Sequence, residues 1–399
     1  MNSPKIRFKG YTEDWEQRKL GDITVKIGSG KTPLGGKSAY VETGIPLIRS
    51  QNVNGDKVDF ADIVYIDEAT DELMANSRVY TNDVLLNITG ASIGRSAVYK
   101  GLESANVNQH VCIIRPTEGH QPDFIQLNLS SDNGQKQIDA SQAGGGREGL
   151  NFQEIGKMQF SFPSLNEQMT IGRYFNSLDH LITLHQRKLE QTKTLKKYML
   201  QKMFPQEGQK VPEIRFEGFT GDWEQRKLSE IALQTYGGGT PKTTNEEFWK
   251  GNIPWIQSSD LIEERLFNVK PRKYISQEAI SKSATKLVPQ NSIAIVTRVG
   301  VGKLAFMPFS YATSQDFLSL SELKIEPEFA VYALYKMMQL VSNEVQGTSI
   351  KGITKDELLA KEFLIPGGEE QKKIGVYLHN LDHLITLHQC KWAWLTEEN

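Results

Sequence analysis

The chain has 399 residues, a formal net charge of −2 and 38% hydrophobic residues. This length suffices for two or three domains, and the near-zero charge excludes a protein that binds nucleic acid as a bulk polycation, so any such contact needs locally clustered cations. The sequence has no apolar run long enough to span a membrane and no signal peptide at its N-terminus. Its two cysteines, Cys112 and Cys390, form neither a disulfide framework nor a metal set. We therefore expect a cytoplasmic protein without metal or cofactor.

The first segments of the chain are predicted to be a turn and a polar loop. Residues 5–23, KIRFKGYTEDWEQRKLGDI, predict a polar turn that leads into a short helix, with Trp15 as an anchor that docks the segment on the fold. Residues 27–38, IGSGKTPLGGKS, form a loop rich in glycine and threonine. The loop resembles a phosphate-binding P-loop, but Val25 stands where that motif requires its first glycine. Nucleotide hydrolysis is therefore excluded at this loop.

Strands and a helix follow. Residues 45–50 form a short apolar run that ends in polar side chains, which predicts a strand that delivers those side chains into a loop. Residues 84–99 predict a hairpin with a glycine-containing turn. A strand at residues 111–114, a helix from about residue 124 to 138 and a glycine-rich charged loop at residues 143–151 complete this region. The region is predicted to be a mixed α/β domain.

A long helix is predicted next, because apolar residues alternate in steps of three and four. They form a heptad-like seam that also contains His185 and Thr192; its apolar members are Ile171, Phe175, Leu178, Ile182, Leu189, Leu195 and Met199. A helix over residues 171–202 would be roughly 48 Å long at 1.5 Å per residue.

The whole series then repeats. The nine letters LDHLITLHQ occur at residues 178–186 and 381–389, and WEQRKL occurs at 15–20 and 223–228. A repeat of roughly 200 residues indicates two domains rather than a solenoid. The two helices could each pack on their own domain, but we expect them to pack against each other as an antiparallel pair. The interface would then contain Phe175, Leu178, Ile182, His185, Leu189, Leu378, Leu381, Ile385 and His388.

The predicted fold class is α+β, with two tandem mixed domains that are each followed by a long helix. The expected boundaries are 1–165 for the first domain, 166–204 for its helix, 205–367 for the linker and second domain, and 368–399 for the second helix. The two copies diverge after Gln389, where the second continues as CKWAWLTEEN. We therefore expect the second helix to be altered and shortened.

The sequence offers no catalytic set. His180 and His185 lie five residues apart, about 140° around a helix, so they cannot share a metal as an i, i+4 pair could. We find no Gly-x-Ser-x-Gly, no HExxH, no paired cysteine nucleophile and no Rossmann-type glycine loop in either copy. We therefore expect a protein that is not an enzyme by itself.

The loops instead contain Arg, Lys, Asn, Gln, Ser and Thr near glycines. Arg and Lys suit guanine edges, Asn and Gln suit adenine edges, and glycine-turn amides can meet phosphates. Ordinary solvated loops are the alternative, but equivalent positions carry different side chains in the two copies, which favours ligand reading. The candidate DNA-binding residues are Lys31, Thr32, Arg49, Ser50, Gln51, Asn52, Thr89, Ser92, Arg95, Asn108, Gln109, Arg147, Thr240, Lys242, Thr243, Gln257, Ser258, Ser259, Thr297, Arg298, Lys303, Ser314, Gln315 and Lys351.

These duplicated features resemble the specificity subunit of type I restriction–modification enzymes over nearly the whole chain. The shared features are the WEQRKL starts, the Gly-x-Thr-Pro loops, the Ile-Pro-x-Ile strands, the Pro-x-x-x-Glu-Gln helix entries and the Leu-Asp-x-x-Ile helices. The resemblance implies two target recognition domains that each read half of a bipartite, asymmetric double-stranded DNA site. It also implies an antiparallel coiled coil that sets their spacing and docks modification subunits, with restriction subunits joining the complex. The altered end after Gln389 departs from the family pattern. The alternative is a tandem-repeat binding module for a non-DNA ligand.

Overall fold

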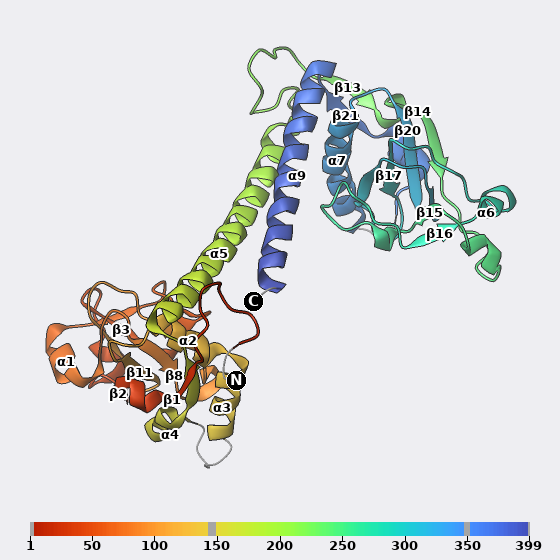
Figure 1. Cartoon of the computed structure of the whole chain (residues 1–399). Helices are drawn as coiled ribbons and strands as arrows, with labels where there is room; N and C mark the ends of the chain where they lie inside the picture. Colours follow the sequence, from red (N-terminus) through yellow and green to blue (C-terminus); the bar gives the residue numbers. More distant parts are fainter. Residues whose placement is uncertain (1–3, 143–148, 347–351, 398–399) are drawn as a thin grey trace. The chain divides into compact units, whose positions relative to one another are not determined.

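The computed structural model describes residues 4–142, 149–346 and 352–397. The chain divides into two compact units, unit 1 (Met1–Leu181) and unit 2 (Ile182–Asn399). The boundary falls inside a long helix, α5 (Leu165–Lys202), and a second long helix, α9 (Gly368–Glu397), ends the described chain (Figure 1). Each unit mixes helices and strands, so the predicted α+β class is confirmed.

Unit 1 contains two four-stranded sheets. The central sheet is antiparallel and has the order β2-β11-β8-β9, and the second sheet has the order β6-β3-β10-β7 with one parallel pair, β3 with β10. The strands are β2 (Thr24–Ser29), β3 (Ile45–Ile48), β6 (Val64–Ile66), β7 (Arg78–Val79), β8 (Val84–Asn87), β9 (Ser96–Val98), β10 (Ala105–Val107) and β11 (Val111–Pro116). Two short antiparallel ribbons add β1 (Glu16–Lys19) with β12 (Gln159–Phe162), and β4 (Val53–Asn54) with β5 (Lys57–Val58).

The central strands are apolar on both faces because they separate two cores. Val84 and Leu86 of β8 face a cluster that includes Phe124, whereas Leu85, between them, faces a cluster that includes Val107 of the second sheet. Successive side chains of a strand point to opposite faces. The run VLLN therefore forms a buried strand with a helical layer on one side and a second sheet on the other.

The helix expected at residues 124–138 is wrong as a single element. The structure has α2 (Pro122–Ser130) and α3 (Asp132–Gln142), separated at Ser131, whose backbone is extended. The Ser131 hydroxyl accepts a hydrogen bond from the Gly134 amide at 3.1 Å, as a helix N-cap does. Gly134 also lies so close to α2 that an added Cβ would come within 2.2 Å of the Asn128 carbonyl oxygen. The remaining short helices of unit 1 are α1 (Glu68–Leu73) and α4 (Phe152–Lys157).

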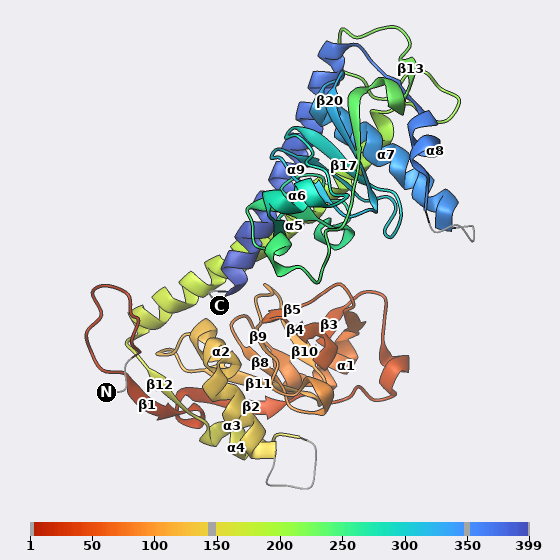
Figure 2. The ribbon, with the colours of Figure 1, turned by 90° about the vertical axis from the view of Figure 1, so that its right-hand side faces the viewer.

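Unit 2 repeats this plan, and Figure 2 labels two strands of its central sheet, β17 and β20, beside helix α7. Its central sheet has the order β14-β20-β17-β18, and its second sheet has the order β16-β15-β19 with the same kind of parallel pair, β15 with β19. The elements are β13 (Glu224–Lys227), β14 (Ala232–Gly237), β15 (Ile253–Ile256), β16 (Lys273–Ile275), α6 (Gln277–Lys282), β17 (Ser292–Val296), β18 (Leu304–Met307), β19 (Ala312–Thr313), β20 (Phe317–Leu323), α7 (Pro327–Gln346), α8 (Lys355–Ala360) and β21 (Glu362–Ile365).

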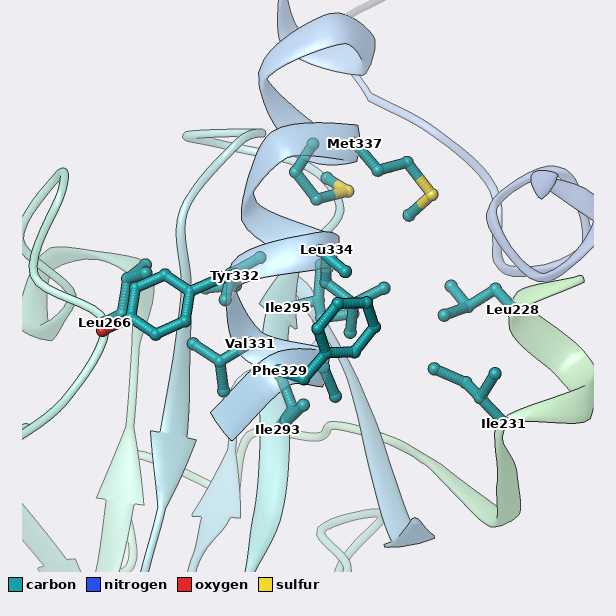
Figure 3. Packing of buried hydrophobic residues seen from close by; sticks show 14 of the residues in the cluster. Leu228, Ile231, Leu266, Ile293, Ile295, Phe329, Val331, Tyr332, Leu334 and Met337 are labelled. Atoms are coloured by element: carbon teal, nitrogen blue, oxygen red, sulfur yellow. The ribbon is translucent and has the colours of Figure 1, made fainter. Parts of the chain in front are cut away.

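The core of unit 2 is built around α7. Figure 3 shows Phe329 and Leu334 of this helix packed against Ile295 of the central sheet and against Leu228 and Ile231. The same cluster takes in Met203 and Phe204 from the end of α5 and Leu378 and Leu381 from α9. Two members of the predicted helix seam, Leu378 and Leu381, therefore also pack on the core of their own domain.

The WEQRKL segments form strands, whereas the sequence predicts turns there. Residues 16–19 and 224–227 form strands β1 and β13, which pair with β12 and β21 immediately before the long helices. The expected docking role of the tryptophans is confirmed: Trp15 packs on Phe124 with ring centroids 5.6 Å apart, and Trp223 is 2% exposed between Phe204 and Phe329.

Within unit 2, the end of α5 and α9 run antiparallel. The Nδ1 atoms of His185 and His388 are 3.1 Å apart, and the Lys196 Nζ lies 2.6 Å from Asp382 Oδ1. The partner's number falls as the position along α5 rises, which only an antiparallel pair allows. The predicted antiparallel arrangement is therefore confirmed.

Candidate nucleic-acid interface

Hydrogen bonds join four of the predicted polar loops of unit 1. Thr32 donates its hydroxyl to the Gln109 carboxamide oxygen, and the His110 ring lies within hydrogen-bond distance of both Gln109 and Thr89. The Asn87 amide donates to the Ser50 carbonyl at 2.8 Å, which ties the end of β8 to the loop after β3. Loops far apart in sequence thus meet at one end of the sheets.

Unit 2 joins its loops in the same way. Thr240 donates to the Gln315 carboxamide oxygen at 2.6 Å, the counterpart of the pair between Thr32 and Gln109. The Ser314 amide bonds to the Ile256 carbonyl at 2.9 Å, beside Gln257. The two units therefore keep this threonine–glutamine hydrogen bond, whereas other loop positions, such as Arg49 and its counterpart Gln257, carry different side chains.

Most of the predicted residues present polar atoms to solvent. The exposed ones are Lys31, Thr32, Gln51, Arg95, Gln109, Thr240, Lys242, Thr243, Ser259, Arg298 and Gln315. The half-buried ones are Arg49, Ser50, Thr89, Ser92, Asn108, Gln257, Ser258 and Lys303. Arg147 and Lys351 lie outside the described residues.

Three predicted residues are buried and hold loops instead. Asn52 is 2% exposed; its oxygen accepts from the Arg49 amide at 3.0 Å and its nitrogen donates to the Asp59 carbonyl at 3.0 Å. Thr297 donates to the Asp316 carbonyl at 3.0 Å, and Ser314 donates to the carboxylate of the same residue. The sequence could not separate these supports from exposed side chains because both classes have the same residue types.

The exposed and half-buried cations differ in what they already bind. The Arg49 guanidinium donates to the Asp62 carbonyl at 2.6 Å, and Gln51 donates to the carboxylate of Asp62. Among the described residues, Arg95, Arg298 and Lys303 form no ion pair, so their charges are free to meet an anion. Arg95 lies in the connection between β8 and β9, and Arg298 and Lys303 lie in the connection between β17 and β18. The predicted hairpin at 84–99 is confirmed by the pairing of β8 with β9, and β17 pairs with β18 in the same way at the repeated position in unit 2.

Sequence reasoning missed a clamp that fixes each domain to its long helix. Arg7 donates two hydrogen bonds to Glu167 at 2.6 and 2.7 Å, and Arg215 donates two to Glu370 at 2.7 and 2.8 Å. These bonds raise the pKa of both guanidinium groups. Both carboxylates are buried, at the entry of α5 and of α9. The repeated Arg-Phe and Glu-Gln dipeptides are the sequence signal from which this clamp could have been predicted.

The glutamines of the same motif complete the clamp. Gln168 accepts from the Gln121 amide at 3.0 Å and donates to the Pro163 carbonyl at 2.9 Å. Gln371 makes the same two bonds, with the Glu326 amide at 3.0 Å and the Pro366 carbonyl at 2.7 Å. The Glu and Gln of the Pro-x-x-x-Glu-Gln motif therefore hold the start of each long helix against its domain in both units.

A cleft of about 810 Å³ opens in unit 2 beside β15 and β16. Its lining includes three predicted residues, Thr240, Thr243 and Gln257, together with Trp249, Trp255, Lys250, Gly251, Arg272, Lys273 and Tyr274, which sequence reasoning did not single out. Among the described residues there is no cluster of three His, Cys, Asp or Glu that could hold a metal. No helix in the described parts of the chain is long and apolar enough to cross a membrane.

Comparison with known proteins matches both units to one family. The family model described as the type I restriction modification DNA specificity domain matches residues 12–194 and again 220–395. The chain is 23% identical over 397 residues to the MjaX type I restriction enzyme specificity subunit of Methanocaldococcus jannaschii, covering 97% of this chain and 91% of that protein. It is 31% identical over 175 residues to the EcoR124I/EcoR124II specificity subunit of Escherichia coli, 41% of this chain and 42% of that one.

Solved structures share the fold. The S subunit of a type I restriction–modification system from M. genitalium matches with a TM-score of 0.61 at 13% identity, over 99% of this chain and 96% of that one. The HsdS subunit from Thermoanaerobacter tengcongensis matches with a TM-score of 0.50 at 18% identity, over 100% and 96% of the two chains.

Proposed function

The chain belongs to the family of type I restriction–modification DNA specificity domains, and from this premise we propose that it is the specificity subunit of a type I restriction–modification complex. Each unit reads one half of a bipartite, asymmetric site in double-stranded DNA. The observation that carries the proposal is that two copies of one frame present different side chains at equivalent loop positions. Two domains with the same fold and different loop side chains are suited to binding two different DNA sequences.

We assign DNA contact to the exposed and half-buried loop residues. Arg95, Arg298 and Lys303 carry charges that no described carboxylate neutralises, and such cations bind phosphates or guanine edges. Gln109 and Gln315 have their oxygen oriented by a threonine hydroxyl, which holds the carboxamide in one direction for reading. Asn52, Thr297 and Ser314 are buried and are assigned to loop support.

The subunit contributes recognition, and its partners contribute catalysis. Modification subunits, which transfer the methyl group, dock on the helix pair of α5 and α9, and restriction subunits join through the assembled complex. The proposed first recognition domain is residues 1–165, the linker and second recognition domain are residues 205–367, and the helices at 166–204 and 368–399 set the spacing. A restriction–modification complex meets its DNA in the cytoplasm, which is the expected location of the chain.

Binding to DNA duplexes tests this function directly. The full chain, assembled with its modification subunits, should bind duplexes that contain the methylated motif of its host more tightly than scrambled duplexes. Its affinity should fall steeply with salt because phosphate contacts release counterions. An assembled complex that binds both duplexes equally, or neither, would favour the alternative of a tandem module for a non-DNA ligand.

A further inference from the structure

The second sheets of the two units share one register but differ in chemistry. In unit 1, Ile45 pairs with Ile66, and Leu47 pairs with Val64. In unit 2, Ile253 pairs with Ile275, and Trp255 pairs with Lys273. Trp255 and Lys273 therefore occupy the places of Leu47 and Val64. An apolar pair in one unit is an aromatic and a cation in the other.

This substitution builds the cleft of unit 2. The rings of Trp249 and Trp255 lie edge to face, with centroids 5.0 Å apart. Each indole N–H is bound to a carbonyl: Trp255 donates to Gly239 at 3.1 Å and Trp249 donates to Lys242 at 3.3 Å. The Lys273 ammonium lies 5.7 Å from both ring centroids. An ammonium on an aromatic face is held there by the ring quadrupole.

Lys273 is also a cation without an acidic partner among the described residues, whereas its neighbours are paired. Lys250 binds Glu247 at 2.8 Å, and Arg272 lies 3.3 Å from Asp260. The two rings thus position the Lys273 charge without neutralising it. A group held in this way keeps its full attraction for an anion that enters the cleft.

The flanking segments of the two units have opposite charge. Residues 261–274 of unit 2 contain four cations, Arg265, Lys270, Arg272 and Lys273, against two glutamates. The equivalent residues 53–65 of unit 1 contain Lys57 against three aspartates. Arg265, Lys270 and Arg272 also line a smaller hollow of about 260 Å³, next to the cleft. Asp260 lines the same hollow and is paired with Arg272, yet the cations of this flank outnumber its acids, whereas acids outnumber cations in the unit 1 segment, so an anionic ligand is favoured on unit 2.

We propose that the cleft formed by Trp249, Trp255 and Lys273 binds a phosphodiester group of the DNA backbone, beside the half-site that unit 2 reads. The inference rests on the proposed function and deepens it, because Thr240 and Gln257 line the same cleft. A stacked base is the weaker occupant: Trp255 is only 4% exposed, and the two rings pack on each other. In unit 1 the apolar pair Leu47 and Val64 occupies the equivalent register, so we expect the two domains to contribute unequally to the binding energy.

Paired variants of two exposed lysines test the anchor. Lys273→Ala removes the proposed contact, and Lys324→Ala removes a cation just past the far end of β20, away from the reading loops. Each variant of the full chain, assembled with its modification subunits, is titrated at several salt concentrations with a duplex that carries the motif and with a scrambled duplex. One phosphate contact changes the salt slope by about 0.9, which is roughly eightfold in affinity at 0.1 M salt.

We expect Lys273→Ala to lose this factor on both duplexes and Lys324→Ala to lose nothing. Lys273→Gln, which keeps the length of the side chain without its charge, should match Lys273→Ala. Two results overturn the anchor: equal behaviour of the Lys273 and Lys324 variants, or a loss confined to the motif duplex, which would indicate a base contact. A wild-type complex that shows no salt-dependent binding to either duplex contradicts the proposed function itself, and with it the anchor.

Discussion

The two units agree where they hold themselves together and differ where they face a ligand. The clamps of Arg7 with Glu167 and of Arg215 with Glu370 have the same two-bond geometry. Beside the reading loops, by contrast, Leu47 is replaced by Trp255. The difference teaches that repeated contacts within this chain mark the shared frame, and that divergence between the copies is found beside the loops proposed to face DNA.

The pair formed by Thr32 and Gln109 and its counterpart of Thr240 and Gln315 lie between these extremes. They sit on exposed loops, yet both units keep them. In unit 1 the His110 ring extends the network to Thr89, and in unit 2 Asp316 occupies the position after the glutamine. Both units therefore keep the threonine–glutamine hydrogen bond, while the residue after the glutamine differs between them.

Breaking the clamp should have the largest effect. Glu370→Ala removes the two hydrogen bonds that the Arg215 guanidinium donates to this buried carboxylate, and hydrogen bonds to charged groups contribute about 1.5–3 kcal/mol each. The neighbouring Glu369 is exposed, so Glu369→Ala serves as the matched control. Urea denaturation of the two variants should separate their free energies of unfolding. Equal stability would show that the clamp is not part of the frame.

Breaking the contact that joins the two long helices to the domain of unit 2 should have the second-largest effect. Asp382 binds the Lys196 ammonium and the Tyr332 hydroxyl, both at 2.6 Å, and burial with this carboxylate raises the pKa of that tyrosine above its usual range. Hydrogen bonds to charged groups contribute about 1.5–3 kcal/mol, so Asp382→Ala should destabilise unit 2 by roughly that amount. The adjacent, exposed His383 provides the control, His383→Ala. Leu127 stands at the position of Tyr332 in unit 1, so a tyrosine hydroxyl at this place occurs in the second copy alone.

Loss of a free cation from the reading loops should change DNA binding without changing stability. Arg95→Ala and Lys303→Ala are each expected to cost about 1–3 kcal/mol at one base pair if the side chain reads a base, or to weaken all sequences alike if it binds a phosphate. The control is Lys136→Ala, which removes an exposed cation from α3. Titrations with a set of single-base variants of the motif distinguish the two modes. Affinity and salt slope equal to wild type would exclude both residues from the interface.

The smallest effect should come from the histidine pair of the helices. Burial, with nearby positive groups, lowers the pKa of His185 and of His388. Because the unfolded chain takes up these protons more readily, their contribution to stability is complete above the usual histidine pKa of about 6.5 and is lost as pH falls from there through the lowered values. The free energy of unfolding, followed from pH 7.5 downward, should fall less for His388→Gln than for wild type. The exposed histidine of the same helix supplies the control, His383→Gln, which should follow wild type.

How much the sequence could predict depended on whether a signal was local. Strand patterns predicted the hairpins. The repeat of LDHLITLHQ predicted two domains of the same plan and an antiparallel pair of helices. The break at Ser131 was not predicted, because it depends on the contact of Gly134 with the preceding helix. Likewise, the clamps join residues about 155 positions apart, and the cleft depends on the register of Trp255 with Lys273. No local pattern reports such contacts.

The independence of the two reading units is the central claim, and an exchange of one unit tests it most directly. Residues 21–160 are replaced by the equivalent segment of a relative with another specificity, and the methylated motif is read across the genome of cells that carry the exchanged chain with its modification subunits. We predict that one half of the motif changes, while the other half and the spacing between them stay as in the parent. A change in both halves, or a changed spacing, would contradict the account.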